Sequence, residues 1–222
     1  IVDVDGAVNF AADVTYADGA DIITASAGTS NFRAGLNAGN TIQSGGNFNV
    51  VVGDEAGTAI TTGDNNVGLG YAALTATTTG TGNTGIGFSA LDANTTASDN
   101  TGVGANSLGV NTTGTRNTSV GSDSLDANTE GNDNTAVGKN ALSANTTASN
   151  NTAVGKNSLA VNTTGSDNTA VGKDAGAAVT TAIKNTLIGG LAGDALNTGS
   201  YNVVLGMQAL SADTKGAKNV AI

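Results

Sequence analysis

The chain has 222 residues, of which eighteen are acidic and eight basic, giving a formal net charge of −10, and it contains no cysteine, histidine, proline or tryptophan. This balance argues against nucleic-acid binding, and the missing cysteine and histidine exclude a disulfide framework, a thiolate nucleophile and the commonest general base. With 33 glycines and only seven aromatic residues, the chain is too poor in large side chains for a conventional globular core. No stretch approaches the ~18 apolar residues of a membrane span, so membrane insertion is not expected.

The first 46 residues differ from the rest of the chain. Apolar residues take the even positions from Val2 to Tyr16, and mostly polar residues lie between them. This alternation predicts strands with one buried face. Four of the seven aromatic residues occur early in the chain, and they could form a small core: Phe10, Tyr16, Phe32 and Phe48. We therefore expect residues 1–46 to form a β-rich connector or cap that covers the open first edge of the domain that follows.

From residue 47 to residue 222 the chain is an array of 17-residue repeats. The motif Asn-x-x-(Val/Ile/Leu)-Gly begins at asparagines 49, 66, 83, 100, 117, 134, 151, 168, 185, 202 and 219. No apolar stripe with helical spacing is present, so strands are favoured. In the repeat 134–150, "NTAVGKNALSANTTASN", we predict two short strands, "NTAVG" and "ALSANT", joined by turns.

Repeats of equal length can stack in register, about 4.8 Å apart, and the sequence therefore predicts an all-β fold, a parallel β-solenoid. One apolar column would enter the core from the first strand, at Val137 and Val154. A second would enter from the second strand, at Leu142 and Leu159, with the residue two positions after each leucine beside it. Only a few medium-sized side chains fit inside each coil, which explains the scarcity of aromatic residues.

The remaining repeated positions are assigned to ladders and turns. Asn134 and Asn151 are expected to hydrogen-bond along the axis, as asparagine ladders do in cross-β assemblies. Asn94, Asn111, Asn128, Asn145 and Asn162 form a second candidate column. Gly138 and Gly155 are expected to close turns, through positive φ or close backbone approach.

So thin a coil buries little apolar surface against the entropy of ordering it, which suggests association with further chains. We predict a homo-oligomer that uses the small residues of the first strand as its outward interface: Gly85, Gly102, Ser119, Ala136, Ala153 and Ala170.

The repeat "NTAVGKNALSANTTASN" resembles the head repeats of trimeric autotransporter adhesins of the YadA type, and more closely the "NTAVG…AL…NTTG" arrays of bacteriophage tail fibres and tail spikes. The resemblance covers about four fifths of the chain, from residue 47 onward. It implies a left-handed β-roll, a homotrimeric fibre and attachment to a host surface. The adhesin repeats are shorter, near 14 residues, so the fibre comparison is the nearer one.

Candidate binding residues are few. Lys139, Lys156 and Lys173 share one repeat position and could contact an anionic glycan, although a solvated row neutralised by neighbouring acids is the alternative. Asp99, Asp133 and Asp167 alternate with Arg116 and Asn150, which indicates a charge-relieving ladder. A calcium site near residues 44–57 is a weaker alternative, because its carboxylates do not recur in each repeat. Threonine columns such as Thr96 and Thr113 lack the Thr-x-Thr grid of ice-binding solenoids.

No catalytic constellation, metal site or cofactor site is predicted, because any carboxylate pair among eighteen acids would be an arbitrary choice. The function we expect is that of a non-enzymatic, structural and adhesive tail-fibre component, extracellular on a virion. Its partners would be its own copies, other tail or virion proteins, and a host glycan or protein receptor. The alternatives are a bacterial trimeric adhesin on the cell surface and a polysaccharide-degrading tail spike, which would use two carboxylates.

Overall fold

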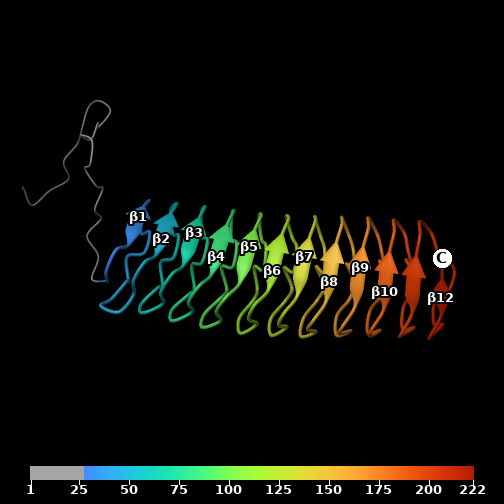
Figure 1. Cartoon of the computed structure of the whole chain (residues 1–222). Helices are drawn as coiled ribbons and strands as arrows, with labels where there is room; N and C mark the ends of the chain where they lie inside the picture. The colour runs from blue at the N-terminus through green and yellow to red at the C-terminus, as the bar shows by residue number, and fades with distance from the viewer. Residues whose placement is uncertain (1–27) are drawn as a thin grey trace, which may run out of the picture.

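The computed structural model describes residues 28–222 as one rod, in which successive coils of the chain lie side by side (Figure 1). Coils spaced by about 4.8 Å give the rod a length on the order of 50 Å. The whole alternating segment from Val2 to Tyr16, with Phe10, lies outside the described residues.

The described residues form a single parallel sheet of twelve strands, each hydrogen-bonded to the next in chain order. The strands are β1 Phe32–Ala34, β2 Val50–Val52, β3 Val67–Leu69, β4 Thr84–Ile86, β5 Thr101–Val103, β6 Thr118–Val120, β7 Thr135–Val137, β8 Thr152–Val154, β9 Thr169–Val171, β10 Thr186–Ile188, β11 Val203–Leu205 and β12 Val220–Ala221. From β2 onward, paired residues are 17 positions apart, as Thr135 and Thr152 are. The predicted all-β parallel solenoid with this period is confirmed.

The ladder includes a coil that begins within residues 1–46, which were expected to form a separate connector or cap. Strand β1 pairs with β2, with Phe32 opposite Val50, so this coil has one residue more than those that follow. Asn31 begins it, and the Asn49 backbone N–H donates to the Asn31 Oδ1 atom at 2.8 Å. Phe48, expected in a small core, is 57% exposed.

Each described coil contains one strand where the sequence analysis predicted two. The segment "ALSANT" consists of turns, and Leu142 adopts a positive φ of 51° that breaks an extended strand. Its backbone nevertheless bonds to the next coil, since the Leu142 N–H donates to the Ser158 carbonyl at 3.0 Å. The prediction of a second strand was wrong because repeated backbone contacts between coils do not require an extended conformation.

The prediction of which strand face points inward was also wrong. Val137 and Val154 point outward, and Val137 is 37% exposed, whereas the intervening Ala136 is fully buried. The reason is the strand period of two: Asn134 and Ala136 share a face, and the buried asparagine column brings the alanine inside with it. The small residues expected at an outward interface, including Ala153, therefore line the core. The companions expected beside the leucines also differ, since Val161 is 43% exposed.

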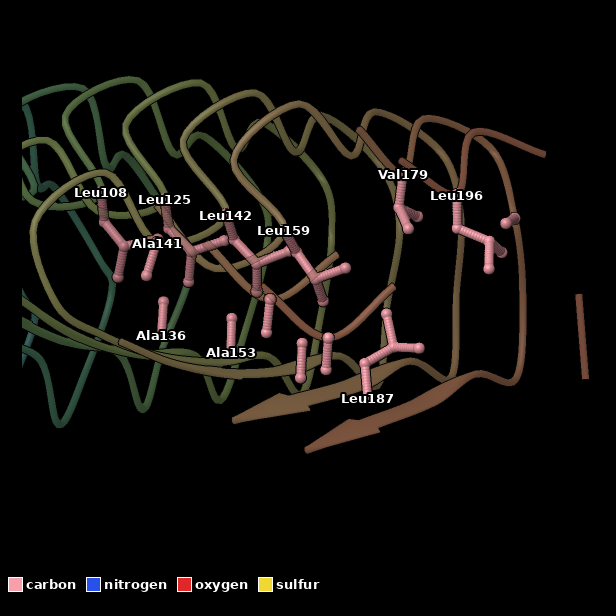
Figure 2. Packing of buried hydrophobic residues seen from close by; sticks show 14 of the residues in the cluster. Leu108, Leu125, Ala136, Ala141, Leu142, Ala153, Leu159, Val179, Leu187 and Leu196 are labelled. Carbon is pink, nitrogen blue, oxygen red and sulfur yellow. The ribbon is translucent and has the colours of Figure 1, made fainter. Parts of the chain in front are cut away.

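Leucines fill the centre of the core, including Leu142 and Leu159, which are completely buried. Figure 2 shows them in a row that faces the small strand residues Ala136 and Ala153. A Cβ atom at Gly102 would already lie 3.3 Å from the Leu91 side chain. The leucines therefore leave room for little more than glycine, serine or alanine at the strand centre.

Coils near the two ends of the rod fill the same space differently. Near the C-terminal end, Leu187 occupies the centre of strand β10, and Gly193 takes the place of the core leucine in the same coil. A Cβ atom at Gly193 would lie 2.9 Å from the Leu187 Cδ2 atom. Val51 and Gly57 repeat this exchange at the other end, where the corresponding distance is 2.6 Å. In each of these two coils, one large residue is paired with one small residue at the two core positions.

This exchange predicts a compensating pair of substitutions. Leu187→Ala should leave a cavity beside Gly193 and lower the free energy of unfolding by about 2–5 kcal/mol. Adding Gly193→Leu should recover part of this loss, because Gly193 has a φ of 57°, close to that of the core leucines. Denaturant unfolding of both variants would measure the coupling, and a double variant no more stable than Leu187→Ala would contradict the exchange.

Both asparagine columns lie inside the coils. The Asn134 N–H and Nδ2 donate to the Asn117 Oδ1 atom at 3.0 and 3.1 Å, and Nδ2 also donates to the Ala148 carbonyl at 2.9 Å. In the second column, Asn145 Nδ2 donates to Asn128 Oδ1 at 2.9 Å. That column ends where Val179 replaces asparagine, and Asn162 Oδ1 is left buried without a hydrogen bond.

A glycine ends nearly every strand of the array, and its conformation is one that other residues rarely adopt. Gly138 has a φ of 134° and Gly155 a φ of 132°. A Cβ atom at Gly138 would lie 2.6 Å from the carbonyl carbon and oxygen of Gly155. Positive φ and close approach between coils, which were the two predicted reasons for glycine, therefore both apply at this position.

Candidate functional site: the outer surface of the solenoid

The outward side chains of strands β2 to β11 form one continuous surface, which we call the outer strand face. It consists of the first and third residue of each strand: threonines or valines in the first row and valine, isoleucine or leucine in the second. The exposed fractions of its second row include 47% for Leu69, 38% for Val120 and 39% for Ile188. Three-residue strands over nine coil spacings give this face an area on the order of 400 Å².

This face is unusual because both faces of a parallel sheet are normally covered. Here the inner face packs on the leucine core, and no segment of residues 28–222 covers the outer one. Its second row is apolar along the whole length of the face, and large exposed apolar patches on monomeric proteins are often interaction sites. The outward residues of the strands are therefore threonine, valine, isoleucine and leucine rather than the small residues that the sequence predicted there.

A second feature runs along the turn that follows each strand-ending glycine. We call it the turn row; in chain order it contains Asp54, Tyr71, Phe88, Ala105, Ser122, Lys139, Lys156, Lys173, Gly190 and Met207. The structure places the three predicted lysines here, exposed on consecutive coils. Lys173 forms an ion pair with Asp174 at 3.2 Å, so the expected neutralisation by a neighbouring acid occurs at one end of the lysines.

The carboxylates beside the lysines are held mainly by other groups. Asp123 accepts hydrogen bonds from Asn106 and Ser122, which lower the pKa of its carboxyl group, and Lys139 adds a smaller electrostatic effect. Asn157 lowers the pKa of Asp174 in the same way. Lys139 and Lys156 form no ion pair among the described residues. They are therefore available to a ligand.

The turn row also contains an aromatic pair that the sequence analysis did not identify. Tyr71 and Phe88 stack with ring centroids 5.6 Å apart and planes inclined by 14°. Each ring is more than half exposed. The signal was present in the sequence, because Tyr71 and Phe88 occupy the same repeat position as the lysines. They lie four repeats before Lys139 and Lys156, respectively.

A separate corner of the coil carries the alternating charges predicted from the sequence. Arg116 donates to both carboxylate oxygens of Asp133, at 2.7 and 2.9 Å. This pairing lowers the pKa of Asp133. Asn150 Nδ2 donates to Asp167 Oδ1 at 3.2 Å. Positive φ is common at this corner, as at Arg116 with 57°, so the column combines turn geometry with charge relief.

Asp126 is half-buried on another side of the coil. Its Oδ1 atom has no hydrogen-bond partner among the described residues, and burial, followed by the charge of Asp123, raises the pKa of its carboxyl group. A raised folded pKa means that the group opposes folding once it is ionised, at pH values above the ordinary aspartate range near ~4. Asp126 therefore lowers stability at neutral pH.

We expect Asp126→Asn to raise the midpoint of thermal unfolding at pH 7, because the amide is neutral and its oxygen still accepts the local backbone bonds. The gain should shrink as pH falls towards ~3, where Asp126 is protonated in both states. Asp123→Asn should behave oppositely, since its lowered pKa contributes stability above the ordinary range that is lost in acid. Equal gains at both pH values would contradict the interpretation.

Residues 28–222 also bear on metal binding and membrane insertion. Asp54 and Glu55, adjacent acids within the weakly calcium-like stretch 44–57, accept hydrogen bonds from the Leu36 N–H and the Asn37 side chain. No group of three or more acids among these residues is arranged to hold a metal ion. The same part of the chain contains no helix long and apolar enough to cross a membrane.

The class that this geometry defines is a parallel β-solenoid rod with one uncovered apolar sheet face and a turn row of aromatic and cationic residues. Comparison with protein-family models, curated proteins and solved structures found no match.

Proposed function

We propose that this chain forms the rigid shaft or head of a viral tail fibre, a structural and adhesive component that attaches the particle to its host. The observation that carries this proposal is the uncovered outer strand face, which runs along the rod. A rod with a continuous apolar side is suited to lateral association of parallel copies.

The partner for this face is a second and a third copy of the chain. Every coil presents nearly the same pair of outward residues, such as Thr135 with Val137 and Thr152 with Val154. Parallel copies related by rotation about a common axis would place equivalent coils at the same level, as closed symmetric oligomers do. The number three rests on the resemblance to fibre and YadA-type repeats. Such a bundle would hold several weak receptor sites in fixed relation and so increase avidity.

The fibre would lie outside the cell, on the virion tail, with other tail proteins at its ends and a host glycan or protein as receptor. The function requires no catalytic step, cofactor or contact with nucleic acid. The mechanism is mechanical: hydrogen-bonded coils resist bending, and association of the apolar faces joins the chains.

The test is molar mass in solution, measured by light scattering at several dilutions. The protein should have a stable mass near three times 21.3 kDa. The variant Val120→Lys, Val137→Glu, Val154→Lys should be a folded monomer. Within one chain, opposite charges on neighbouring strands attract one another, so the fold should be retained. Burial of the same charges between chains would be unfavourable.

A matched control places the same charges on an exposed threonine column elsewhere on the coil: Thr147→Lys, Thr164→Glu, Thr181→Lys. It should retain the oligomeric mass. A wild-type protein that stays folded and monomeric at all concentrations would overturn the fibre proposal, as would equal dissociation of both variants.

A further inference from the structure

The size of the side chains changes abruptly within the turn row. Phe88 stacks on Tyr71 on one side, while the next two positions are Ala105 and Ser122, and Lys139 follows. With coils about 4.8 Å apart, Phe88 and Lys139 are separated by roughly 14 Å along the axis. On the side of Phe88 that is turned away from Tyr71, the next two residues of the row, Ala105 and Ser122, therefore have small side chains.

This arrangement combines two kinds of recognition on one line. An exposed aromatic face offers apolar stacking to the apolar face of a ligand ring. Lys139 and Lys156, which form no ion pair among the described residues, offer two cations on adjacent coils. Six coil spacings from Tyr71 to Lys173 give a track of about 29 Å. A small anion would use one end of the track, whereas an extended polymer could use all of it.

We propose that the turn row binds an extended acidic polysaccharide, with a sugar ring stacked on Phe88 and carboxylate, sulfate or phosphate groups at Lys139 and Lys156. This inference deepens the proposed attachment function by naming the class of receptor, and it rests on that function for its biological meaning. The binding itself needs no second copy of the chain, because all of its residues lie on one rod.

Single-stranded nucleic acid also stacks on aromatic residues and contacts lysine. It is disfavoured here by the net charge of −10 and by the carboxylates of Asp123 and Asp174 beside the lysines. Nucleic-acid binding depends strongly on phosphate neutralisation by many cations, and the turn row has three.

The experiment measures binding of oligogalacturonate by the whole protein, with the fully methyl-esterified oligomer as the neutral comparison. The acidic form should bind, and its affinity should fall as ionic strength rises. Lys139→Ala with Lys156→Ala should weaken binding by about fivefold or more at low salt and flatten the salt dependence. Phe88→Ala should weaken binding at every salt concentration, because stacking is not screened.

The control uses an aromatic and lysine pair outside the turn row. Lys184 lies 5.6 Å from the centroid of the Tyr201 ring, and both residues have positive φ. Lys184→Asn with Tyr201→Asn removes a cation and an aromatic ring, with residues that tolerate that backbone conformation. This variant should bind oligogalacturonate as the wild type does.

Three results would overturn the inference: no binding of the acidic form, equal loss in the control variant, or tighter binding of oligothymidylate than of oligogalacturonate. The outcome is separable from the fibre proposal. If the wild type is monomeric yet binds through Phe88 and the lysines, the inference stands and the fibre proposal fails. If the wild type is an oligomer that binds none of these probes, the reverse holds.

Discussion

Replacing Gly138 by alanine is expected to destabilise the solenoid by more than about 3 kcal/mol, because two penalties combine. The φ of 134° is strained for any residue with a Cβ atom. The new methyl group would also lie 2.6 Å from the backbone carbonyl of Gly155 in the next coil. The backbone cannot move away without breaking the bond from the Gly155 N–H to the Val137 carbonyl.

Denaturant unfolding followed by circular dichroism would measure this effect. Gly190→Ala is a suitable control, since its φ is not in the left-handed region and its nearest neighbour beyond the adjacent residues is the Lys173 carbonyl oxygen at 3.9 Å. The control should leave stability unchanged or raise it by about 0.4–1 kcal/mol, through the lower entropy of the unfolded chain. Similar losses in the two variants would show that close approach between coils is not the cause.

Asn134→Ala is the second substitution with a large expected effect. Asn134 Oδ1 accepts from the Asn151 N–H at 3.0 Å and from Asn151 Nδ2 at 3.3 Å. Alanine would leave both buried donors unpaired, at a cost of about 1–3 kcal/mol each. The total loss of about 2–6 kcal/mol is a large part of the stability of an ordinary domain.

Asn162→Ala provides a matched comparison, because Asn162 is equally buried but ends its column. Its Oδ1 atom has no hydrogen-bond partner, so the substitution leaves no donor unpaired. It removes one hydrogen bond from each of two acceptors, the Asn145 Oδ1 atom and the Gly165 carbonyl. Unpaired carbonyl oxygens are tolerated better than unpaired N–H groups. The loss should therefore be clearly smaller than for Asn134→Ala. If urea unfolding gave equal losses of stability for the two variants, unpaired donors would not be the main cause of the loss.

The candidate site was predictable in part. The lysines were found because Lys139, Lys156 and Lys173 share a repeat position. Tyr71 and Phe88 share that position too, but aromatic residues are expected to fit poorly inside a thin coil, and the repeat alone does not show that this position lies on the surface. The outer strand face was misassigned, because "NTAVG" alternates equally well with either face inward, and large residues are normally assigned to the core.

The sequence by itself determined the period, the parallel stacking and the columns of identical residues. A constant repeat length brings equivalent positions together whatever the shape of the coil. The tertiary structure alone decided which columns point inward. In an interior already filled by Leu142 and lined by the Asn134 column, the strand can contribute only Ala136, and Val137 is turned to the outside. The apolar outer face, and with it the proposed association of chains, follows from that competition for space.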